Sequence, residues 1–201
     1  MILLPRTLLS RYRLWPQWIA VALLLLSISA AATALEKPVV DPALLSQLKQ
    51  AAAEADSFND QYDAEVWLVE KEPALARLVK DPAQRIALLK LIHSEASRAG
   101  LSPEIVLALI EVESHFDSYA VSSAGAQGMM QIMPFWKHEI GRPEDNLINI
   151  QTNLRYGCTI LKYYLDREKG RLADALARYN GSYGQYWYSE RVLDSWEKHW
   201  R

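Results

Sequence analysis

The chain has 201 residues, of which 50% are hydrophobic and 23% charged, so it contains enough apolar material for a packed core. The formal net charge of −2 gives no basic excess, which excludes broad electrostatic attraction to nucleic acid. The single cysteine, Cys158, excludes an intramolecular disulfide, and the four scattered histidines lack the spacing of a metal site. We therefore expect no metal ion and no nucleic-acid partner.

Residues 1–34 have the features of an export signal in the usual order. Three arginines lie within residues 1–13, and no charged residue occurs from Leu14 to Leu35. The segment ends in Ala32-Thr33-Ala34, a small-residue pattern that suits signal-peptidase cleavage. The uncharged run is also long enough to span a bilayer, so an uncleaved inner-membrane anchor over residues 14–35 is the alternative. In both cases we expect the remaining chain to be exported to the periplasm.

After this segment the chain is predicted to be all-α. Asp-Pro and Ser-Pro pairs are typical helix starts, and glycine is a typical stop, as at Gly100, Gly141 and Gly170. No convincing period-two alternation indicates a strand. The predicted helices cover residues 41–55, 63–80 with an interruption at Pro73, 81–99, 102–116, 129–140, 147–169, 172–179 and 188–200. We divide the exported part into a helical N-terminal extension, residues 35–80, and a main domain, residues 81–201.

Two glutamates two residues apart, Glu111 and Glu113, interrupt the apolar run of the helix predicted over 102–116. At about 100° per residue, Glu113 falls on the same face as Leu109 and Ile110. Glu111 falls on the opposite side with Glu104, and we interpret both as solvated. A carboxyl group on an apolar face must be paired, neutralised or directed into a cleft. Its protonated form would suit a general acid, and the alternative is a buried glutamate satisfied by a core partner.

Two later segments carry uncharged polar groups that suit a sugar ligand. The loop "SSAGAQGMMQ" (122–131) combines small residues with a glutamine, which lets backbone amides approach a ligand closely. The segment "ARYNGS" (177–182) adds an aromatic hydroxyl and an amide. Such groups bind neutral polar ligands and lack the positive charge that phosphate needs.

The segment "ESHFDSYAVSSAGAQGMMQIMP" (113–134) resembles the core signature of the soluble lytic transglycosylase (SLT) family, which is related in fold to goose-type lysozyme. The segments "NLRYGCTIL" (153–161), "ARYNGS" and "YSERVL" (188–193) resemble the later motifs of that family, in the same order. The resemblance covers about residues 85–195. The chain departs from the family at Met129, where leucine is usual, at Arg178, where alanine is frequent, and at Ser182-Tyr183, which replaces Gly-Pro-Gly. The last departure concerns the rim of the expected cleft.

The resemblance implies a lysozyme-like catalytic domain that cleaves the MurNAc-β-1,4-GlcNAc bond of peptidoglycan, or murein, without a cofactor. Glu113 would be the single catalytic acid/base. It would protonate the glycosidic oxygen and then accept the proton of the muramyl C6 hydroxyl, which closes a 1,6-anhydro ring. The implied partner is the peptidoglycan glycan strand, with membrane contact only through an uncleaved N-terminal segment. The alternatives are a hydrolytic muramidase on the same fold and a non-catalytic glycan-binding envelope protein.

The resemblance also implies a set of substrate-binding residues around Glu113. Tyr179 would orient Glu113, and Asn180 would hold the acetamido group or the oxocarbenium-like sugar. The remaining candidates have both a binding and a structural interpretation. Gln131 could contact a sugar or brace the loop, and Ser114 could bind an acetamide or fix the end of the helix. Ser123 could contact the cleft or cap a turn, and Met129 could belong to the cleft wall or to the core.

The other conspicuous side chains have mainly structural interpretations. Asp117 could form a pair with Glu113 if the helix continued, but we expect the helix to end near Phe116 and Asp117 to cap the next loop. Cys158 lies in an apolar helical stripe and is predicted to be core. The aromatic cluster Tyr183, Tyr186, Trp187 and Tyr188 could line sugar subsites, but Val192 and Trp196 continue Tyr188 at helical spacing, so the cluster is predicted to pack in the core.

Overall fold

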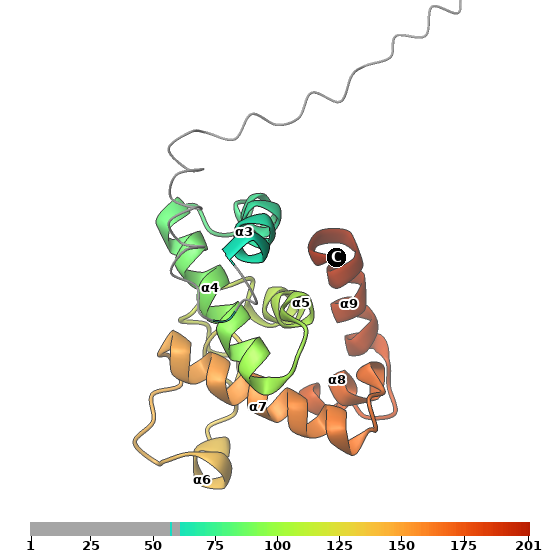
Figure 1. Ribbon diagram of the computed structural model, residues 1–201. Helices are drawn as coiled ribbons and strands as arrows, with labels where there is room; N and C mark the ends of the chain where they lie inside the picture. Colours follow the sequence, from blue (N-terminus) through green and yellow to red (C-terminus); the bar gives the residue numbers. More distant parts are fainter. Residues whose placement is uncertain (1–56, 58–60) are drawn as a thin grey trace, which may run out of the picture. The chain divides into compact units, whose positions relative to one another are not determined.

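The computed structural model describes Ser57 and residues 61–201, so the predicted export signal and the predicted helix over 41–55 lie outside the described residues (Figure 1). This part of the chain is mainly helical and contains no β-sheet, only the isolated bridges Val121–Gln127 and Gln127–Ile132. Its helices are α3 (Gln61–Leu75), α4 (Pro82–Ala99), α5 (Pro103–Ser114), α6 (Trp136–Ile140), α7 (Ile150–Arg167), α8 (Leu172–Asn180) and α9 (Trp187–Ser195), which continues into a π-helical turn, η1 (Trp196–Trp200). The all-α prediction is confirmed. None of the described helices has both the length and the apolar character of a membrane span.

The caps that the sequence indicates set the ends of α4 and α5. The Asp81 side chain accepts a backbone hydrogen bond ahead of Pro82, and Gly100 ends α4 in the left-handed conformation, with φ of 67°. Ser102 caps the start of α5 in the same manner as Asp81, and His115, with φ of 52°, ends this helix. The predicted bounds of both helices therefore agree with the structure to within two residues.

The predicted helix over 129–140 is wrong in its first half. Only Trp136–Ile140 is helical, because the chain before it turns tightly, with positive φ at Gly128 (73°) and Gln131 (49°). The predicted interruption of the first described helix also differs, since α3 runs through Pro73 and ends two residues later.

Helix α5 lies at the centre of the packing, where it contacts α4, α9 and η1 (Figure 1). Every residue from Ile105 to Ile110 is buried, so the first turns of this helix have no solvated face. The other contacts join α3 to α4, α4 to α7, α7 to α8 and α8 to α9, and α3 also contacts η1. Helices from both ends of the described chain therefore cover α5.

The prediction that Glu111 and Glu104 lie on a solvated face is wrong. Glu111 is only 7% exposed, and its carboxylate accepts hydrogen bonds from Ser195 Oγ (2.8 Å) and Trp200 Nε1 (2.7 Å). Glu104 is half-buried and accepts a hydrogen bond from Trp67 Nε1 at 2.6 Å. Helical phase separated the two faces of α5, but it could not reveal that α3 and η1 cover the second face.

The buried side chain of Asn153 on α7 holds the loop that follows α5. Its Oδ1 accepts a hydrogen bond from the Met130 amide (2.7 Å), and its Nδ2 donates to Gln127 O and Leu147 O (both 2.8 Å). This close approach needs a glycine on α7, because a Cβ atom at Gly157 would lie 2.2 Å from Met130 Sδ. The loop is thereby fixed against α7.

Candidate active site

The candidate site is centred on Glu113, in the last turn of α5. Its side chain is partly buried, and its Oε1 accepts a hydrogen bond of 2.5 Å from the Tyr188 hydroxyl. Burial raises the pKa of Glu113 from 4.5 to about 7, against the opposing effects of the Tyr188 hydrogen bond and the positive charge of Arg191. Such a carboxyl group is close to half protonated at neutral pH, so it can both donate and accept a proton.

Tyr188 is the contact of Glu113 that the sequence did not reveal. It is 2% exposed, which confirms the prediction that it packs in the core. In addition, its hydroxyl is directed at a carboxylate 75 residues away in the sequence. Among its predicted companions, Tyr183, Tyr186 and Trp187 are each about half exposed, so the core prediction is wrong for these three. They lie in the loop between α8 and α9 or at the start of α9, where Tyr183 and Tyr186 contact side chains of α8 that are themselves only half-buried, Arg178 and Asp174.

Tyr179, the residue expected to orient Glu113, donates its hydrogen bond to Met130 O at 2.7 Å. Burial raises the pKa of Tyr179 well above 10, and the negative charge of Glu113 contributes as well. Tyr179 is therefore close enough to Glu113 to be affected by its charge. Its hydroxyl braces the loop after α5, and the hydroxyl that bonds to Glu113 belongs to Tyr188.

Ser114 and Gln131 make the contacts of their structural interpretations, fixing of the helix end and bracing of the loop. Ser114 Oγ donates to Met129 O at 2.8 Å, which ties the end of α5 to the loop. Gln131 Nε2 donates to Ala120 O (3.2 Å) and Gly128 O (3.0 Å), so its amide group braces the loop from inside. Met129 is 1% exposed, in agreement with its core interpretation.

Asn180 and Ser123 are the exposed members of the predicted set. Asn180 is the last residue of α8, and Gly181 ends that helix in the left-handed conformation, with φ of 84°. Ser123 lies in the turn between α5 and the loop glycines. Both side chains are accessible to a ligand.

Asp117 caps the loop after α5, as predicted. The helix has ended at Ser114, and positive φ values at His115 (52°) and Phe116 (66°) reverse the chain. The exposed Asp117 side chain accepts the Tyr119 backbone hydrogen bond at 2.8 Å. Its carboxylate therefore does not lie one helical turn beyond Glu113, so the structure agrees with the capping prediction and not with the alternative, a carboxylate pair.

Cys158 is fully buried on α7, which confirms its core interpretation. Burial raises the pKa of its thiol to about 12, so the reactive thiolate form is suppressed.

A separate groove of about 520 Å³ lies between α6 and α7. Four of its nine lining residues are aromatic, namely Phe135, Trp136, Tyr163 and Tyr164. No predicted site residue lines this groove, so it is distinct from the surroundings of Glu113.

Comparison with known proteins identifies the family. Residues 90–193, just over half of the chain, match the family model described as the transglycosylase SLT domain. The chain therefore belongs to the transglycosylase SLT domain family, which confirms the resemblance seen in its motifs.

Similar proteins are named as lytic murein transglycosylases. Membrane-bound lytic murein transglycosylase F of Desulfosudis oleivorans is 36% identical over 98 residues, which cover 47% of this chain and 22% of that protein. Membrane-bound lytic murein transglycosylase C of Actinobacillus pleuropneumoniae is 48% identical over 46 residues, which cover 23% of this chain and 13% of that protein. The matches thus span less than a quarter of the length of these relatives.

A solved structure of an inactive mutant of lytic transglycosylase Slt from Pseudomonas aeruginosa is also similar. It is 25% identical in sequence with a TM-score of 0.43, and the match covers 81% of this chain and 32% of that one.

Proposed function

We propose that this protein is a lytic transglycosylase that cleaves the MurNAc-β-1,4-GlcNAc bond of peptidoglycan and leaves a 1,6-anhydro-MurNAc end. The observation that carries the proposal is the partly buried Glu113 carboxyl group, with a pKa of about 7, in a member of the SLT family. The similar proteins are named lytic murein transglycosylases, which supports peptidoglycan as the substrate.

In this proposal Glu113 transfers protons in both halves of the reaction. The protonated carboxyl group donates to the glycosidic oxygen as the bond from C1 to that oxygen breaks. The resulting carboxylate then accepts the proton of the C6 hydroxyl as O6 bonds to C1, so the enzyme returns to its starting state. A pKa near 7 suits a group with both tasks. Because Oε1 holds the Tyr188 hydrogen bond, Oε2 is the atom that exchanges protons with the glycan.

One carboxyl group suffices if the substrate supplies the second group. Ordinary retaining glycosidases pair an acid with a carboxylate nucleophile. Here Asp117 is exposed and caps a loop, so Glu113 acts alone. The acetamido group of the muramyl sugar then stabilises positive charge at C1, and the C6 hydroxyl takes the place of water as the attacking group.

The supporting roles follow from which polar atoms the protein leaves available. Exposed Asn180 binds the acetamido group or the oxocarbenium-like sugar, and exposed Ser123 contacts the glycan further along. Gln131 uses its Nε2 within the loop, so its carbonyl oxygen accepts from a sugar hydroxyl. Ser114 and Met129 act indirectly by holding the loop against the end of α5.

The protein works on the cell wall outside the inner membrane. In this proposal residues 1–34 direct export, either as a cleaved signal or as an anchor, and residues 81–201 form the catalytic domain. The similar proteins are named membrane-bound, which agrees with action at the envelope. The glycan strand is the partner.

Digestion of purified peptidoglycan sacculi tests the proposal. Wild type should release muropeptides with 1,6-anhydro ends, detected by mass spectrometry, and Glu113→Gln should bind sacculi without releasing them. Activity should decline as the pH rises above about 7, because the protonated acid is lost. Products with reducing ends would favour the muramidase alternative. Binding without cleavage by wild type would favour the glycan-binding alternative, and equal activity of both forms would refute the role of Glu113.

A further inference from the structure

Glu111 is a second buried carboxylate on α5, two residues before Glu113 and on the opposite side of the helix. Its two oxygens are bound by different parts of the chain. Arg77, which follows α3, forms an ion pair with Oε1 at 2.6 Å. The other oxygen, Oε2, accepts hydrogen bonds from Ser195 (2.8 Å) and Trp200 (2.7 Å), both from the C-terminal segment. Glu111, on the side of α5 that faces away from Glu113, thus joins three segments: α5, the residues after α3 and the C-terminal segment.

The π-helical turn η1 is what brings the C-terminal side chains to one oxygen atom. Besides Ser195 and Trp200, His199 also lies on Glu111 Oε2, with its Nδ1 at 3.1 Å. Trp200 is fully buried, and the Arg77 guanidinium lies over its ring at 5.6 Å from the centroid. Wide helical turns of this kind are rare and often occur at functional sites. The turn follows directly on α9, the helix that carries Tyr188 near its start.

Helix α5 and the α9–η1 segment are therefore joined at two points. At one point the Tyr188 hydroxyl bonds to Glu113, and at the other Ser195 and Trp200 bond to Glu111. Ser195 lies seven residues after Tyr188, about two helical turns along the same axis. Because α9 is continuous from Tyr188 to Ser195, the contacts at Ser195 restrict how far the Tyr188 end can shift along α5.

We infer that Glu111 is a positioning residue for the proposed reaction: it fixes α9 against α5 so that the Tyr188 hydroxyl meets Glu113. This inference rests on the proposed role of Glu113 as the acid. It also gives part of the predicted N-terminal extension a role, since Arg77 supplies the positive charge that the buried carboxylate needs.

The ionised form of Glu111 is what holds these contacts. Burial alone would raise its pKa, but hydrogen bonds from Arg77, Ser195 and Trp200 outweigh burial and hold the pKa below its usual value. A glutamine at this position would lose the charge that pairs with Arg77. It would also bring an NH2 group among side chains that are themselves donors, so Glu111→Gln should loosen the end of α9.

The state of Glu113 reports on that loosening. The groups that face it are Tyr188 and Arg191 from α9 and Tyr179 from α8. The Tyr188 hydrogen bond lowers the pKa of Glu113, so its loss should raise this pKa above about 7. The alkaline midpoint of activity should then move to higher pH.

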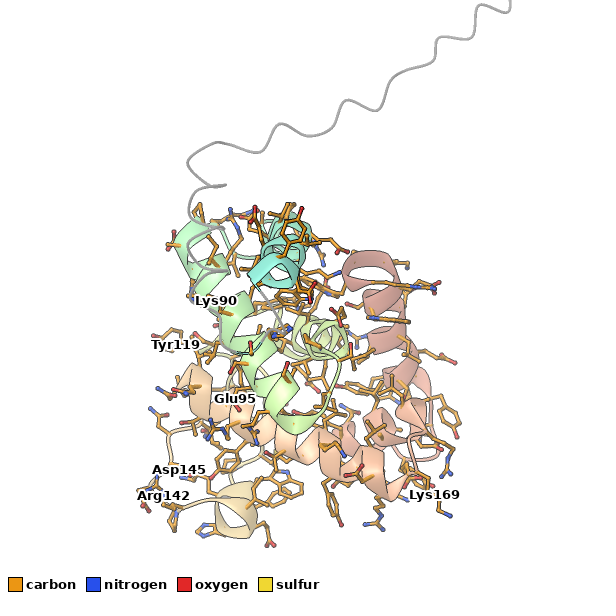
Figure 2. The ribbon with its side chains drawn as sticks, in the orientation of Figure 1. Lys90, Glu95, Tyr119, Arg142, Asp145 and Lys169 are labelled. Carbon is orange, nitrogen blue, oxygen red and sulfur yellow. The ribbon has the colours of Figure 1, made fainter. Side chains whose placement is uncertain are left out.

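A matched control exists in Glu95 on α4 (Figure 2). Glu95 is 2% exposed and is held by Arg98 and by Arg155 of α7, at 2.7 and 2.6 Å. It is thus a buried, ion-paired carboxylate whose two ion pairs lie within α4 and between α4 and α7. A merely structural effect of neutralising a buried carboxylate should appear equally in Glu95→Gln.

The experiment measures kcat, KM and pH profiles on soluble murein glycan strands, with urea unfolding alongside. Glu111→Gln should lower kcat about tenfold, as displaced catalytic groups do, with KM unchanged and the alkaline midpoint raised. Arg77→Gln, which removes the partner charge, should act in the same direction. Glu95→Gln should lower the urea midpoint but leave kcat and the pH profile unchanged.

Combination with Tyr188→Phe gives the decisive comparison. If Glu111 acts through the contact of Tyr188 with Glu113, the double variant should shift the midpoint no further than Tyr188→Phe alone. Additive shifts, or a wild-type kcat and midpoint in Glu111→Gln, would overturn the inference. A further measurement separates this inference from the proposed function. If wild type makes no anhydro product, the proposed function fails. The titration of the carboxyl group of isotopically labelled Glu113, followed by NMR in wild type and in Glu111→Gln, still tests whether Glu111 positions Tyr188 against Glu113.

Discussion

Replacement of Glu113 by glutamine should change how the stability of the protein depends on pH. In the folded protein the pKa of Glu113 is about 7, whereas the unfolded chain has the ordinary value of 4.5. Below pH 4.5 the group is protonated in both states and burial carries little penalty. As the pH rises towards 7, the unfolded chain loses the proton first, so folding of wild type becomes less favourable. Glu113→Gln keeps a similar shape and has no proton to lose.

The size of the effect follows from the difference between the two pKa values. One pKa unit is worth about 1.4 kcal/mol, so a rise from 4.5 to about 7 corresponds to about 3 kcal/mol. Because the side chain is partly open to water, screening reduces this to about 2 kcal/mol. The free energy of unfolding of Glu113→Gln, relative to that of wild type, should therefore be about 2 kcal/mol higher at pH 8 than at pH 4.

Urea unfolding of both proteins at pH 4 and pH 8 measures this difference. A change of about 2 kcal/mol moves the urea midpoint by about 1 M at the usual slopes, which is readily resolved. Glu95→Gln is a control whose stability should change with pH in the opposite direction. Burial acts to raise the pKa of Glu95, but the hydrogen bonds and positive charges of Arg155 and Arg98 outweigh burial and hold this pKa below its usual value. Its contribution is present at high pH and lost as the pH falls, so Glu95→Gln should be most destabilising at pH 8. If the difference in midpoint between wild type and Glu113→Gln were the same at both pH values, Glu113 would have an ordinary pKa and the reasoning would be refuted.

Two further predictions concern the hydroxyls near Glu113 and the packing of the loop after α5. Tyr188→Phe should raise the alkaline midpoint of activity, because it removes a hydrogen bond that lowers the pKa of Glu113. Tyr179→Phe, which loses a bond to Met130 O, should leave the midpoint unchanged. The same midpoint in both variants would contradict this assignment. Gly157→Ala should destabilise the fold by about 1–3 kcal/mol in urea titrations, since the new methyl group would overlap Met130 Sδ, and unchanged stability would show that the loop is not held tightly against α7.

Local rules were sufficient for the features that depend on neighbours in the sequence. Asp81 and Gly100 marked the two ends of α4, because a capping side chain and a left-handed glycine act within a few residues. The family motifs and helical phase together singled out Glu113, whose pKa is raised by burial. The pKa values of Glu95, Glu104, Glu111, Asp145 and Asp174 are instead held below their usual values. The buried state of Cys158 followed from its apolar helical stripe in the same way.

Contacts between distant segments were decided by the tertiary structure alone. Glu111 was predicted to be solvated because helical phase places it opposite Glu113, on the side of Glu104. Arg77 and Trp200, 34 residues before and 89 residues after it, nevertheless bind its carboxylate, and Arg77 pairs its charge. The hydrogen bond from Tyr188 to Glu113 spans 75 residues and has no local signature. The sequence by itself determined which ionisable residues lie on each face of α5. Only the packing of α3, α9 and η1 determined which of those faces meets water, because burial is a property of the partner surface as much as of the helix.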